Sequence, residues 1–385
     1  SHLGVFRKDL IDAVGGFREG FEGAQDHDLL LRCVLELADP ARQVVHIPRV
    51  LYHWRSSEGS TALAGSEKDY AARAGLKAVN NYLENSGEAA VAEAGRFPNT
   101  FRVRYPLPQP LPLVSLLVPT RNGVEILRPC VDAILERTGY RHFELLILDN
   151  QSDCPETLAY MDEVQRRDKR VRVVRWDHPF NYSAINNFGA QQAKGSILGL
   201  INNDIEPINS DWLSEMVSHA VRPEVGCVGA KLYYPNHKVQ HGGVILGIGG
   251  VAGHSHKFAD RDAPGYFYRL MLAQNLSAVT GACLLLRKEV FEAVGGLEEQ
   301  HLKIAFNDVD LCLKVREAGY WNVWTPYAEA IHHESVSRGK EDTPEKQARF
   351  ASEVAYMKKR WQHRLQNDPA YNPNLTLAFE DFSLR

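Results

Sequence analysis

The sequence predicts an α/β fold with a mainly parallel sheet, helices on both of its faces and an α+β half built onto one end. Three observations lead to this prediction. Apolar runs typical of buried strands alternate with amphipathic stretches between residues 113 and 201. Polar clusters follow three of these runs, and beyond residue 207 the alternation loosens and glycine becomes frequent. Repeated β–α–β units favour parallel strands that are joined by right-handed crossovers.

Length and composition indicate an ordinary globular protein. A chain of 385 residues predicts about two to three domains, and 44% hydrophobic with 24% charged residues allows a sizeable core. A net charge of −4 gives no electrostatic reason to expect a nucleic acid partner. No apolar run approaches the ~20 residues of a membrane span. The six cysteines are scattered and form no CxxC pair, which favours a reducing compartment and argues against a zinc site.

The elements of the parallel half follow from the apolar periodicity. We expect strands at 113–118, 143–148, 171–175 and 197–201, separated by helices at 124–137, 155–167 and 183–194. The later half is predicted to hold helices at 212–221, 288–294 and 308–318, strands at 225–232 and 276–286, and strands on either side of a glycine-rich stretch, 239–253. A last helix begins at Thr343-Pro344-Glu345, where proline suits the first turn.

An internal repeat marks the beginning of the chain. Residues 5–17 (VFRKDLIDAVGGF) match residues 285–297 (LLRKEVFEAVGGL), and Asp26-His27-Asp28-Leu29 then matches Asp308-Val309-Asp310-Leu311. Pro48 and His53 fall near the places of Pro326 and His332. The first copy lacks the first half of the unit that it repeats, and we expect truncation from a longer tandem protein. Between the copies, a helix is predicted from Ser66 to about Glu93, and prolines 98–112 predict a stiff linker ending near residue 110.

Polar side chains cluster where three parallel strands end. These clusters are Pro119-Thr120-Arg121-Asn122-Gly123, Asp149-Asn150-Gln151-Ser152-Asp153 and Asn202-Asn203-Asp204-Ile205-Glu206. Each alone reads as a polar turn, but ligands of open α/β sheets bind beyond the carboxyl ends of the strands, so three together favour a nucleotide site. Asp204 and Glu206 suit a hard divalent cation shared with phosphates. The absence of GxGxxG and GxxxxGK motifs disfavours dinucleotide oxidoreductases and P-loop enzymes.

Asp308 stands at the beginning of a predicted helix. A carboxylate in the first turn of a helix is stabilised as the anion, which is the form that a general base requires. On this pattern alone capping of the helix is the expected role for Asp308, since capping is the usual role of Asp at such a position, and Asp310 is expected to be structural. His254 and His256 alternate in a loop and look like metal ligands, but solvated loop histidines are the commoner case.

Seven stretches then carry a resemblance, in this order: VSLLVPTRNG (114–123), ELLILDNQSD (144–153), FNYSAINNFGA (180–190), LINNDIEP (200–207), TGACLLLRKEVFEAVGG (280–296), FNDVDLCLKVREAGY (306–320) and IHHESVSRG (331–339). Together they resemble the family 2 glycosyltransferases of the GT-A fold, in particular the bacterial rhamnosyltransferase-like group that builds O-antigen and other surface polysaccharides. The resemblance implies a partial GT-A-like module at 1–60, a helix and linker at 61–110, a glycosyltransferase domain at 111–340 and a C-terminal helix and tail at 341–385.

The resemblance also implies residue roles. Asp308 would be the catalytic base. The metal motif of the family falls on residues 202–204, with asparagine in its first position, so that Asp204, Glu206 and one of His332 and His333 would hold a divalent cation, Mg²⁺ or Mn²⁺. The nucleotide-sugar site that we expect consists of Pro119, Thr120, Arg121, Asn122, Asp149, Asn150, Ser152, Asn187, Gly189 and Asn203. The first copy lacks all nucleotide-binding strands, and we expect it to be catalytically silent in this chain.

The function implied is inverting, metal-dependent transfer of a sugar from a nucleotide-diphosphate donor to a saccharide or lipid-linked saccharide acceptor in bacterial surface polysaccharide synthesis. Such an enzyme would be cytoplasmic, either free or peripherally bound at the inner face of the cell membrane. Two alternatives stay open. A sugar nucleotidyltransferase would use a similar sheet, although residues 119–123 are too short and too weakly basic for a triphosphate loop. A non-catalytic carbohydrate-binding fragment would explain the asparagine in the metal motif.

Overall fold

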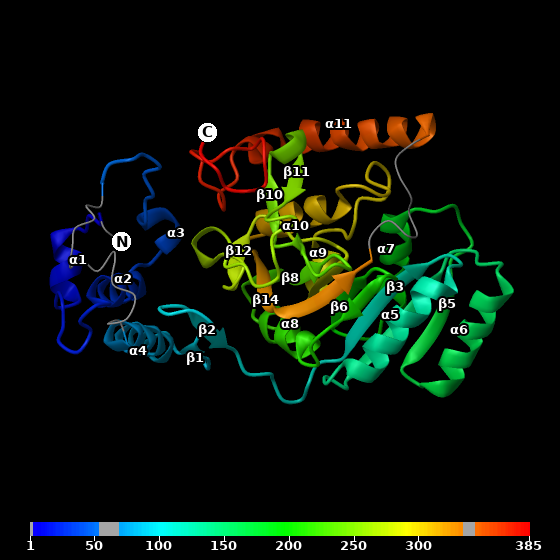
Figure 1. Ribbon diagram of the computed structural model, residues 1–385, viewed down its shortest axis with the longest axis horizontal. Coiled ribbons are helices and arrows are strands. Elements are labelled where there is room, and N and C mark those ends of the chain that lie inside the picture. Colours follow the sequence, from blue (N-terminus) through cyan, green and yellow to red (C-terminus); the bar gives the residue numbers. More distant parts are fainter. Residues whose placement is uncertain (1–2, 54–68, 334–342) are drawn as a thin grey trace. The chain divides into compact units, whose positions relative to one another are not determined.

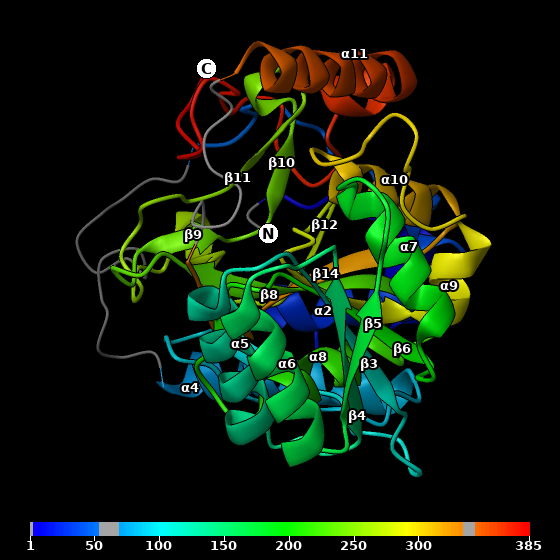
Figure 2. The same ribbon diagram turned by 90° about the vertical axis from the view of Figure 1, so that its right-hand side faces the viewer.

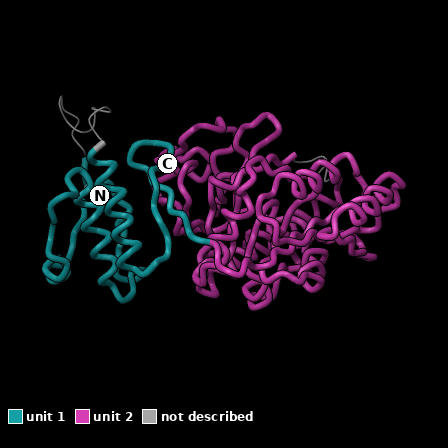
Figure 3. Tube along the Cα trace, turned by 90° about the horizontal axis from the view of Figure 1, so that it is seen from below, with its two compact units in different colours: residues 1–106 teal, residues 107–385 magenta. Residues whose placement is uncertain are grey.

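The computed structural model describes residues 3–53, 69–333 and 343–385 and divides into two compact units. Unit 1 is Ser1–Pro106 and unit 2 is Leu107–Arg385, coloured teal and magenta in Figure 3. Residues 334–339 of the last family-like stretch and the predicted helix start at Ser66 lie outside the described residues. Within those ranges, no helix combines the length and the apolar composition that a membrane crossing requires.

Unit 1 consists of helices followed by a hairpin. Its helices are α1 (Lys8–Ala13), α2 (Gln25–Leu35), α3 (Pro40–Gln43) and α4 (Asp69–Asn85), and its strands are β1 (Val91–Ala94) and β2 (Phe101–Arg104). Helices α2 and α4 pack together, and β1 pairs antiparallel with β2. The helix predicted to reach Glu93 ends at Asn85, because Gly87 with φ of 74° turns the chain out of the helix. The hairpin also replaces the first part of the stretch expected to be a linker.

Unit 2 is built on a mixed, mostly parallel sheet (Figure 1). Its strand order is β12-β14-β8-β13-β6-β3-β4-β5, with β7 added to β14 and β9 to β8. Strands β3, β4, β5 and β6 are mutually parallel where they pair, whereas β13 runs antiparallel to both β6 and β8. The strands are β3 (Val114–Thr120), β4 (Phe143–Asp149), β5 (Val171–Arg175), β6 (Ile197–Ile201), β7 (Ile205–Pro207), β8 (Val225–Tyr233), β9 (Val239–His241), β12 (Gln274–Leu276), β13 (Cys283–Arg287) and β14 (Trp321–His332).

Two apolar cores lie on the two faces of this sheet. On one face, α5 (Val124–Arg137), α6 (Pro155–Arg167) and α8 (Trp212–Ala220) pack against the side chains of the central strands that point to that face. On the other face lie α7 (Tyr182–Gln192), α9 (Lys288–Ala293), α10 (Asn307–Glu317) and α11 (Pro344–Gln366). Figure 2 shows α5 and α6 on one side of strands β3, β4 and β5 and α7 on the other, with α11 at the top of the view. Alternate side chains of each strand point to opposite faces, so strands buried on both faces read as continuous apolar runs.

The later half differs from its prediction in two places. The strand predicted over 276–286 is split into β12 and β13 by a turn at 277–282. Strand β14 was not predicted at all. Its sequence contains Pro326, and the pairing of β14 with β8 shifts register between Trp324 and Glu329, where the proline is accommodated. The glycine-rich stretch forms the hairpin of β10 (Val244–Leu246) and β11 (Ala252–His254), beside β9.

The two copies of the repeat have the same local conformation. Helix α1 spans the six residues that correspond to α9, and α2 the eleven that correspond to α10. The residues before α1 and α9 have nearly equal angles (φ −66°, ψ 139° and φ −64°, ψ 139°). Both Gly-Gly pairs that follow have positive φ. The helices of the two copies therefore correspond residue for residue, whereas the residues before α2 and α10 differ, with φ of −135° at Ala24 and 60° at Phe306.

Candidate active site

The carboxyl ends of the central strands meet at one edge of the sheet in unit 2. Thr120 at the end of β3 is the register partner of Asp149 at the end of β4, and β6 runs parallel to β3 beside them. Ile201 at the end of β6 pairs with Cys283 at the beginning of β13, so the turn that precedes β13 reaches the same edge. Three polar strand ends and that turn are thus brought together.

The turn between β6 and β7 is held on both sides by backbone hydrogen bonds. The N–H of Asn202 donates to the Ala282 carbonyl at 2.9 Å, and the N–H of His333 donates to the Asp204 carbonyl at 3.1 Å. The Asn203 amide donates to Thr120 Oγ1 at 3.0 Å and so ties this turn to the end of β3. Asp204 is thereby fixed at the sheet edge with a side chain that is only 4% exposed.

Asp204 faces His332 from the end of β14. Asp204 Oδ1 is a buried oxygen without a hydrogen-bond partner, yet it lies 3.2 Å from His332 Nε2. His332 Nδ1 lies 2.7 Å from Gln240 Oε1 and donates to it, while the Asn202 amide nitrogen lies 3.3 Å from Nε2 and donates to that atom. In this neutral tautomer the lone pair of Nε2 points towards the orphaned carboxylate oxygen. Two lone pairs that face each other at this distance suit a cation.

These residues fit the divalent cation that the fold family implies. Mg²⁺-like ions are commonly held by one or two carboxylates, with substrate phosphates and water completing the shell, and Mn²⁺ accepts carboxylate, imidazole and water ligands. Among the residues that the structure describes, no group of three His, Cys, Asp or Glu side chains converges on one point. Asp204 and His332 therefore offer two protein ligands at an edge open to a phosphate-bearing ligand.

Glu206 and His333 form a second pair. His333 Nε2 lies 3.2 Å from Glu206 Oε2, and Arg137 Nη1 donates to Glu206 Oε1 at 2.8 Å. Burial alone would raise the pKa of the Glu206 carboxyl, but the hydrogen bonds from His333 and Arg137 outweigh it and hold this pKa below its usual value. The structure thus separates the two histidines, with His332 at Asp204 and His333 at Glu206.

Asp308 lies in the first turn of α10 beside the turn before β13. The Gly281 N–H donates to Asp308 Oδ2 at 2.9 Å, and the Val309 N–H donates to Oδ1 at 2.8 Å. A Cβ on Gly281 would come within 3.2 Å of the Asp308 Cβ, so the absence of a side chain permits this close approach. Asp308 is half-buried.

Tyr182 connects Asp308 with the metal motif, and sequence reasoning did not single it out. Its hydroxyl lies 3.2 Å from Asn202 Oδ1 and 3.1 Å from the Gly281 carbonyl oxygen. Burial, reinforced by the nearby Asp308 carboxylate, raises the pKa of this hydroxyl. Asn202 therefore accepts from Tyr182 and donates to His332, which is a bridging role. Its place in the FNYSAINNFGA stretch was the only sequence signal for Tyr182.

The ends of β3 and β4 form a hydrogen-bonded corner. The Asn122 N–H donates to Ser152 Oγ at 2.8 Å, and the Asn122 side-chain oxygen accepts from the N–H groups of Asp153 and Cys154. Arg121 is exposed beside this corner, and Pro119 is buried within β3. These hydrogen bonds fix the position of the loop after β3 relative to the loop after β4.

Asp149 and Asn150 lie beneath that corner. Asp149 is buried, accepts from Ser152 N–H, and pairs with Arg175 Nη1 at 3.0 Å. Asn150 donates to the carbonyl of His178 at 2.8 Å, while its own Oδ1 is buried without a partner. The Asp149 carboxylate is thus already neutralised by Arg175, a residue that the sequence did not single out.

Asn187 and Gly189 are explained by packing. The Asn187 side chain donates to the Leu297 carbonyl at 2.9 Å and accepts from the Leu297 N–H at the same distance. A Cβ on Gly189 would lie 2.5 Å from Leu148 Cδ1. Helix α7 can approach β4 at that point only because residue 189 is glycine.

His241 and His254 form a buried pair next to these groups. The Thr280 N–H donates to His241 Nε2 at 3.4 Å, so His241 carries its proton on Nδ1 and donates to His254 Nδ1 at 3.0 Å. Burial, with the neighbouring His254 and His332, lowers the pKa of His241 well below its usual value and keeps the ring neutral. His256 instead accepts from the Tyr266 N–H at 3.1 Å. These histidines are therefore organised by hydrogen bonds inside unit 2.

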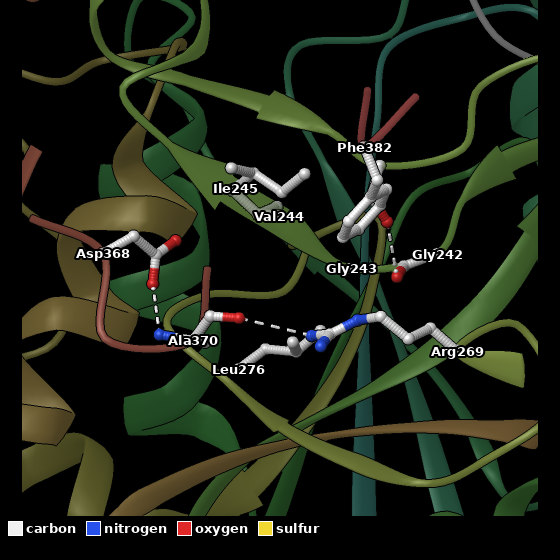
Figure 4. A pocket seen from close by; sticks show the side chains of 10 residues that line it. Gly242, Gly243, Val244, Ile245, Arg269, Leu276, Asp368, Ala370 and Phe382 are labelled. Carbon is white, nitrogen blue, oxygen red and sulfur yellow. Dashed lines mark hydrogen bonds between the residues drawn. The ribbon is translucent and has the colours of Figure 1, made fainter. Parts of the chain in front are cut away.

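A small pocket lies elsewhere in unit 2 (Figure 4). Arg269 crosses it and donates to the Ala370 carbonyl, and the Phe382 ring covers it from the C-terminal tail. None of the strand-end residues lines it. The polar edge described above, rather than this pocket, carries the arrangement suited to chemistry.

Comparisons with known proteins define the class of this fold. The mannosyltransferase PcManGT from Pyrobaculum calidifontis, solved in complex with GDP-Man and Mn²⁺, superposes with a TM-score of 0.50 and 15% identity, covering 79% of this chain and 76% of that one. Unit 2 therefore has the GT-A fold, which is the fold of nucleotide-sugar-dependent glycosyltransferases. Residues 115–295 match the model of Glycosyl transferase family 2. That stretch is thus similar to family 2 glycosyltransferase domains.

Two curated relatives align with the whole chain. A protein of Sinorhizobium fredii, y4gI, described as uncharacterized, is 54% identical over 385 residues. The O-antigen biosynthesis protein RfbC of Myxococcus xanthus is 41% identical over 385 residues. The chain spans 42% of the length of the first and 29% of the length of the second.

Proposed function

We propose that this chain is a metal-dependent, inverting glycosyltransferase that moves a sugar, a hexose or rhamnose, from a nucleotide-diphosphate donor to a saccharide acceptor. The observation that carries the proposal is the meeting of the Asp204–His332 pair with Asp308 at the carboxyl edge of a family 2 domain. Tyr182 connects the two, through Asn202 on one side and Gly281 on the other.

Asp204 and His332 would hold the divalent cation, Mg²⁺ or Mn²⁺. Such a cation, when bound, offsets negative charge on the departing diphosphate. Asn202 and Gln240 both orient the His332 ring, Asn202 at Nε2 and Gln240 at Nδ1. Together they direct the lone pair of Nε2 towards Asp204. The Glu206 carboxylate is already hydrogen-bonded to His333 and Arg137. We therefore place Glu206 and His333 beside the metal position rather than in it.

Asp308 would be the general base. The N–H groups of Gly281 and Val309 each donate to one oxygen of this carboxylate and hold it in place. An acceptor hydroxyl would transfer its proton to Asp308 as its oxygen attacks the anomeric carbon of the donor. One base without a second nucleophilic carboxylate corresponds to a single displacement, and a single displacement inverts the anomeric centre.

The nucleotide would lie over the ends of β3 and β4. Thr120, Asn122, Asn150 and Ser152 line that corner, Asn203 fixes it to the metal turn, and exposed Arg121 can reach a phosphate. Asp149 would act through its fixed position under the corner, since its carboxylate is paired with Arg175. We assign no nucleotide contact to Asn187 and Gly189, because packing explains both.

The biological setting follows from the relatives. One of them, from Myxococcus xanthus, is named an O-antigen biosynthesis protein. We propose the same class of role here, the assembly of a bacterial surface polysaccharide on a saccharide or lipid-linked saccharide acceptor. The site of action would be the cytoplasm, either free or at the inner face of the cell membrane.

A nucleotide-sugar screen tests this proposal. Thermal unfolding is followed with UDP-, dTDP- and GDP-sugars, each with and without Mn²⁺. We expect one base to raise the melting temperature, and to do so more strongly with Mn²⁺, because a ligand of the native state stabilises it. The matching donor should then release nucleoside diphosphate when an acceptor is present. Pyrophosphate release from a nucleoside triphosphate and a sugar phosphate would instead identify a nucleotidyltransferase. Absence of binding by all nucleotides would overturn both activities.

A further inference from the structure

Unit 1 exposes apolar side chains whose counterparts in the repeat are buried. Val5 is 92% exposed, whereas the corresponding Leu285 in β13 is 0% exposed. Phe17 is 65% exposed and its counterpart Leu297 is 2% exposed. Because residues 8–13 and 288–293 form corresponding helices, the difference lies in what covers the residues on either side of them. In unit 2 the strands β6 and β8 cover Leu285 by pairing with β13 on either side, whereas Leu297 lies against α7, where its N–H donates to Asn187 Oδ1.

A polar residue shows the same contrast. Arg7 pairs with Asp9 at 3.2 Å, as Arg287 pairs with Glu289 at 2.9 Å. The Arg287 side chain also donates to the carbonyls of Ala220 and Pro223, in the turn between α8 and β8. The Arg7 side chain is 72% exposed and the Arg287 side chain 13%. The Arg7 guanidinium therefore presents the same donors, but the described residues of unit 1 contain no counterpart of the α8–β8 turn to accept from them.

The residues that follow α3 repeat the pattern. Residues 44–52 carry six exposed apolar side chains, Val44, Val45, Ile47, Val50, Leu51 and Tyr52. Pro48 aligns with Pro326, which places this stretch in register with β14. In unit 2 the counterpart of Val45 is Val323, which is buried and pairs with Val228 of β8. Two separate stretches of unit 1 thus lack the same neighbour, a strand equivalent to β8.

From these contrasts we infer that residues 3–7, Phe17 and residues 44–52 form one docking surface, and that its occupant is a polypeptide segment N-terminal to residue 1 in the same gene product. That segment would supply the equivalents of β6, α8 and β8, that is, the nucleotide-binding half of a second glycosyltransferase domain. The inference rests on the glycosyltransferase fold of unit 2. The completed domain would carry Asp26 in the place of Asp308.

A second copy of this chain does not fit as the occupant. The elements that would complete unit 1 are β6 and β8, and in unit 2 the strand β13 already lies between them. Another copy therefore has no vacant β6–β8 pair to offer. The lengths of the relatives agree with an occupant from the same polypeptide, since both align over all 385 residues and are more than twice as long.

Hydrogen exchange tests the inference. The 385-residue chain is compared with the longest polypeptide that its gene encodes, by mass spectrometry of peptides covering residues 3–7, 44–53 and 283–287. We expect the first two peptides to exchange freely in the 385-residue chain and at least about a hundredfold more slowly in the longer polypeptide. Residues 283–287 should be protected in both. Equal, fast exchange of the first two peptides in both proteins would overturn the inference, as would concentration-dependent protection in the shorter chain.

Matched substitutions give a second readout. Val5→Asp should leave the melting temperature of the 385-residue chain unchanged and lower it in the longer polypeptide. Leu285→Asp should unfold unit 2 in both, and Val91→Asp, at an exposed position of the β1–β2 hairpin, should be neutral in both. If Val5→Asp left the melting temperature of the longer polypeptide unchanged, the proposed docking surface would be wrong. These readouts measure protection and stability, so an inactive but folded unit 2 would refute the proposed function and leave this inference intact.

Discussion

Asp204 Oδ1 and His332 Nε2 lie 3.2 Å apart, and this carboxylate oxygen is buried without a hydrogen-bond partner, while the Asn202 amide nitrogen lies 3.3 Å from Nε2. Burying a carboxylate oxygen without a partner is unfavourable. The pair is therefore stabilised by any cation that both atoms can bind. His333, one residue later, is directed to Glu206 instead, since neighbouring residues at a strand end point in opposite directions.

The first prediction compares the two histidines. His332→Ala should raise the Mn²⁺ concentration needed for half-maximal transfer by roughly 100-fold, because it deletes a direct ligand and leaves Asp204 as the main anchor. His333→Ala should change that concentration by less than about threefold. Metal titration of initial rates, with nucleotide release as the signal, distinguishes them. The assignment is wrong if the two variants respond alike or in the opposite order.

The second prediction concerns Asp308. Asp308→Asn keeps the size of the side chain and can still accept from the Gly281 N–H, so folding and donor binding should be unchanged. The rate of transfer should fall by roughly 10²–10⁴-fold, the range expected when a general base is lost. Nucleotide-sugar binding by calorimetry and transfer rates on the same preparation make the comparison. Full transfer activity in this variant would leave Asp308 with a capping role only.

Asp310, two residues along α10, provides the matched structural case. It is fully buried, and Trp361 Nε1 donates to its Oδ1 at 2.8 Å, with Lys314 Nζ at 3.6 Å from Oδ2. Asp310→Ala should lower the free energy of unfolding by about 3 kcal/mol, because it leaves the indole N–H of Trp361 unpaired and removes the carboxylate that lies beside Lys314 and Arg360. Below the melting temperature the remaining folded enzyme should keep its KM for the donor. A large KM change at unchanged stability would contradict this role. Asp28 in unit 1 is similarly buried between Arg18 and Arg32.

The parallel half was predictable because its signals are local. The bounds of α5, α6, β5 and β6 agree with the prediction, since each element is an uninterrupted periodic or apolar run that ends at a polar or turn-forming residue. The sheet edge that collects Thr120, Asp149 and Asp204 follows directly from strands that run parallel. The expectation of an α/β fold of the GT-A type is accordingly confirmed.

Several features of the site could not be predicted from the sequence, because they depend on pairing and packing between residues far apart in the chain. Strand β14 contains Pro326 and was missed, although it delivers His332 to Asp204 by pairing with β8 and β7. The choice between His332 and His333 depends on the register of that strand. Tyr182 and Gln240 reach the site only through the packing of α7 and β9, and no local pattern marks them. The buried partner of Asp149, Arg175, depends on the register between β4 and β5.

Gly189 gives a prediction that separates packing from donor binding. A Cβ at this position would lie 2.5 Å from Leu148 Cδ1, so Gly189→Ala should push α7 away from β4. We expect a loss of about 1–3 kcal/mol in the free energy of unfolding, as for other overpacked cores. The donor KM of the folded protein should stay within about twofold of the parent. A donor KM that rises without loss of stability would restore Gly189 to the nucleotide site.

The last prediction concerns acid stability and His256. Burial, followed by the charges of Arg269 and Lys231, lowers the pKa of His256 from 6.5 to about 4. Its Nε2 accepts from the Tyr266 N–H and therefore must be unprotonated in the folded state. The unfolded chain takes up this proton at a higher pH than the folded chain does, so the contribution to stability is present above pH 6.5 and is lost as the pH falls towards 4. The full shift corresponds to at most about 3 kcal/mol. Urea unfolding between pH 7.5 and 4.5 should show a steeper loss of stability in the parent than in His256→Gln, which cannot titrate. Parallel curves for the two proteins would show that His256 does not carry this dependence.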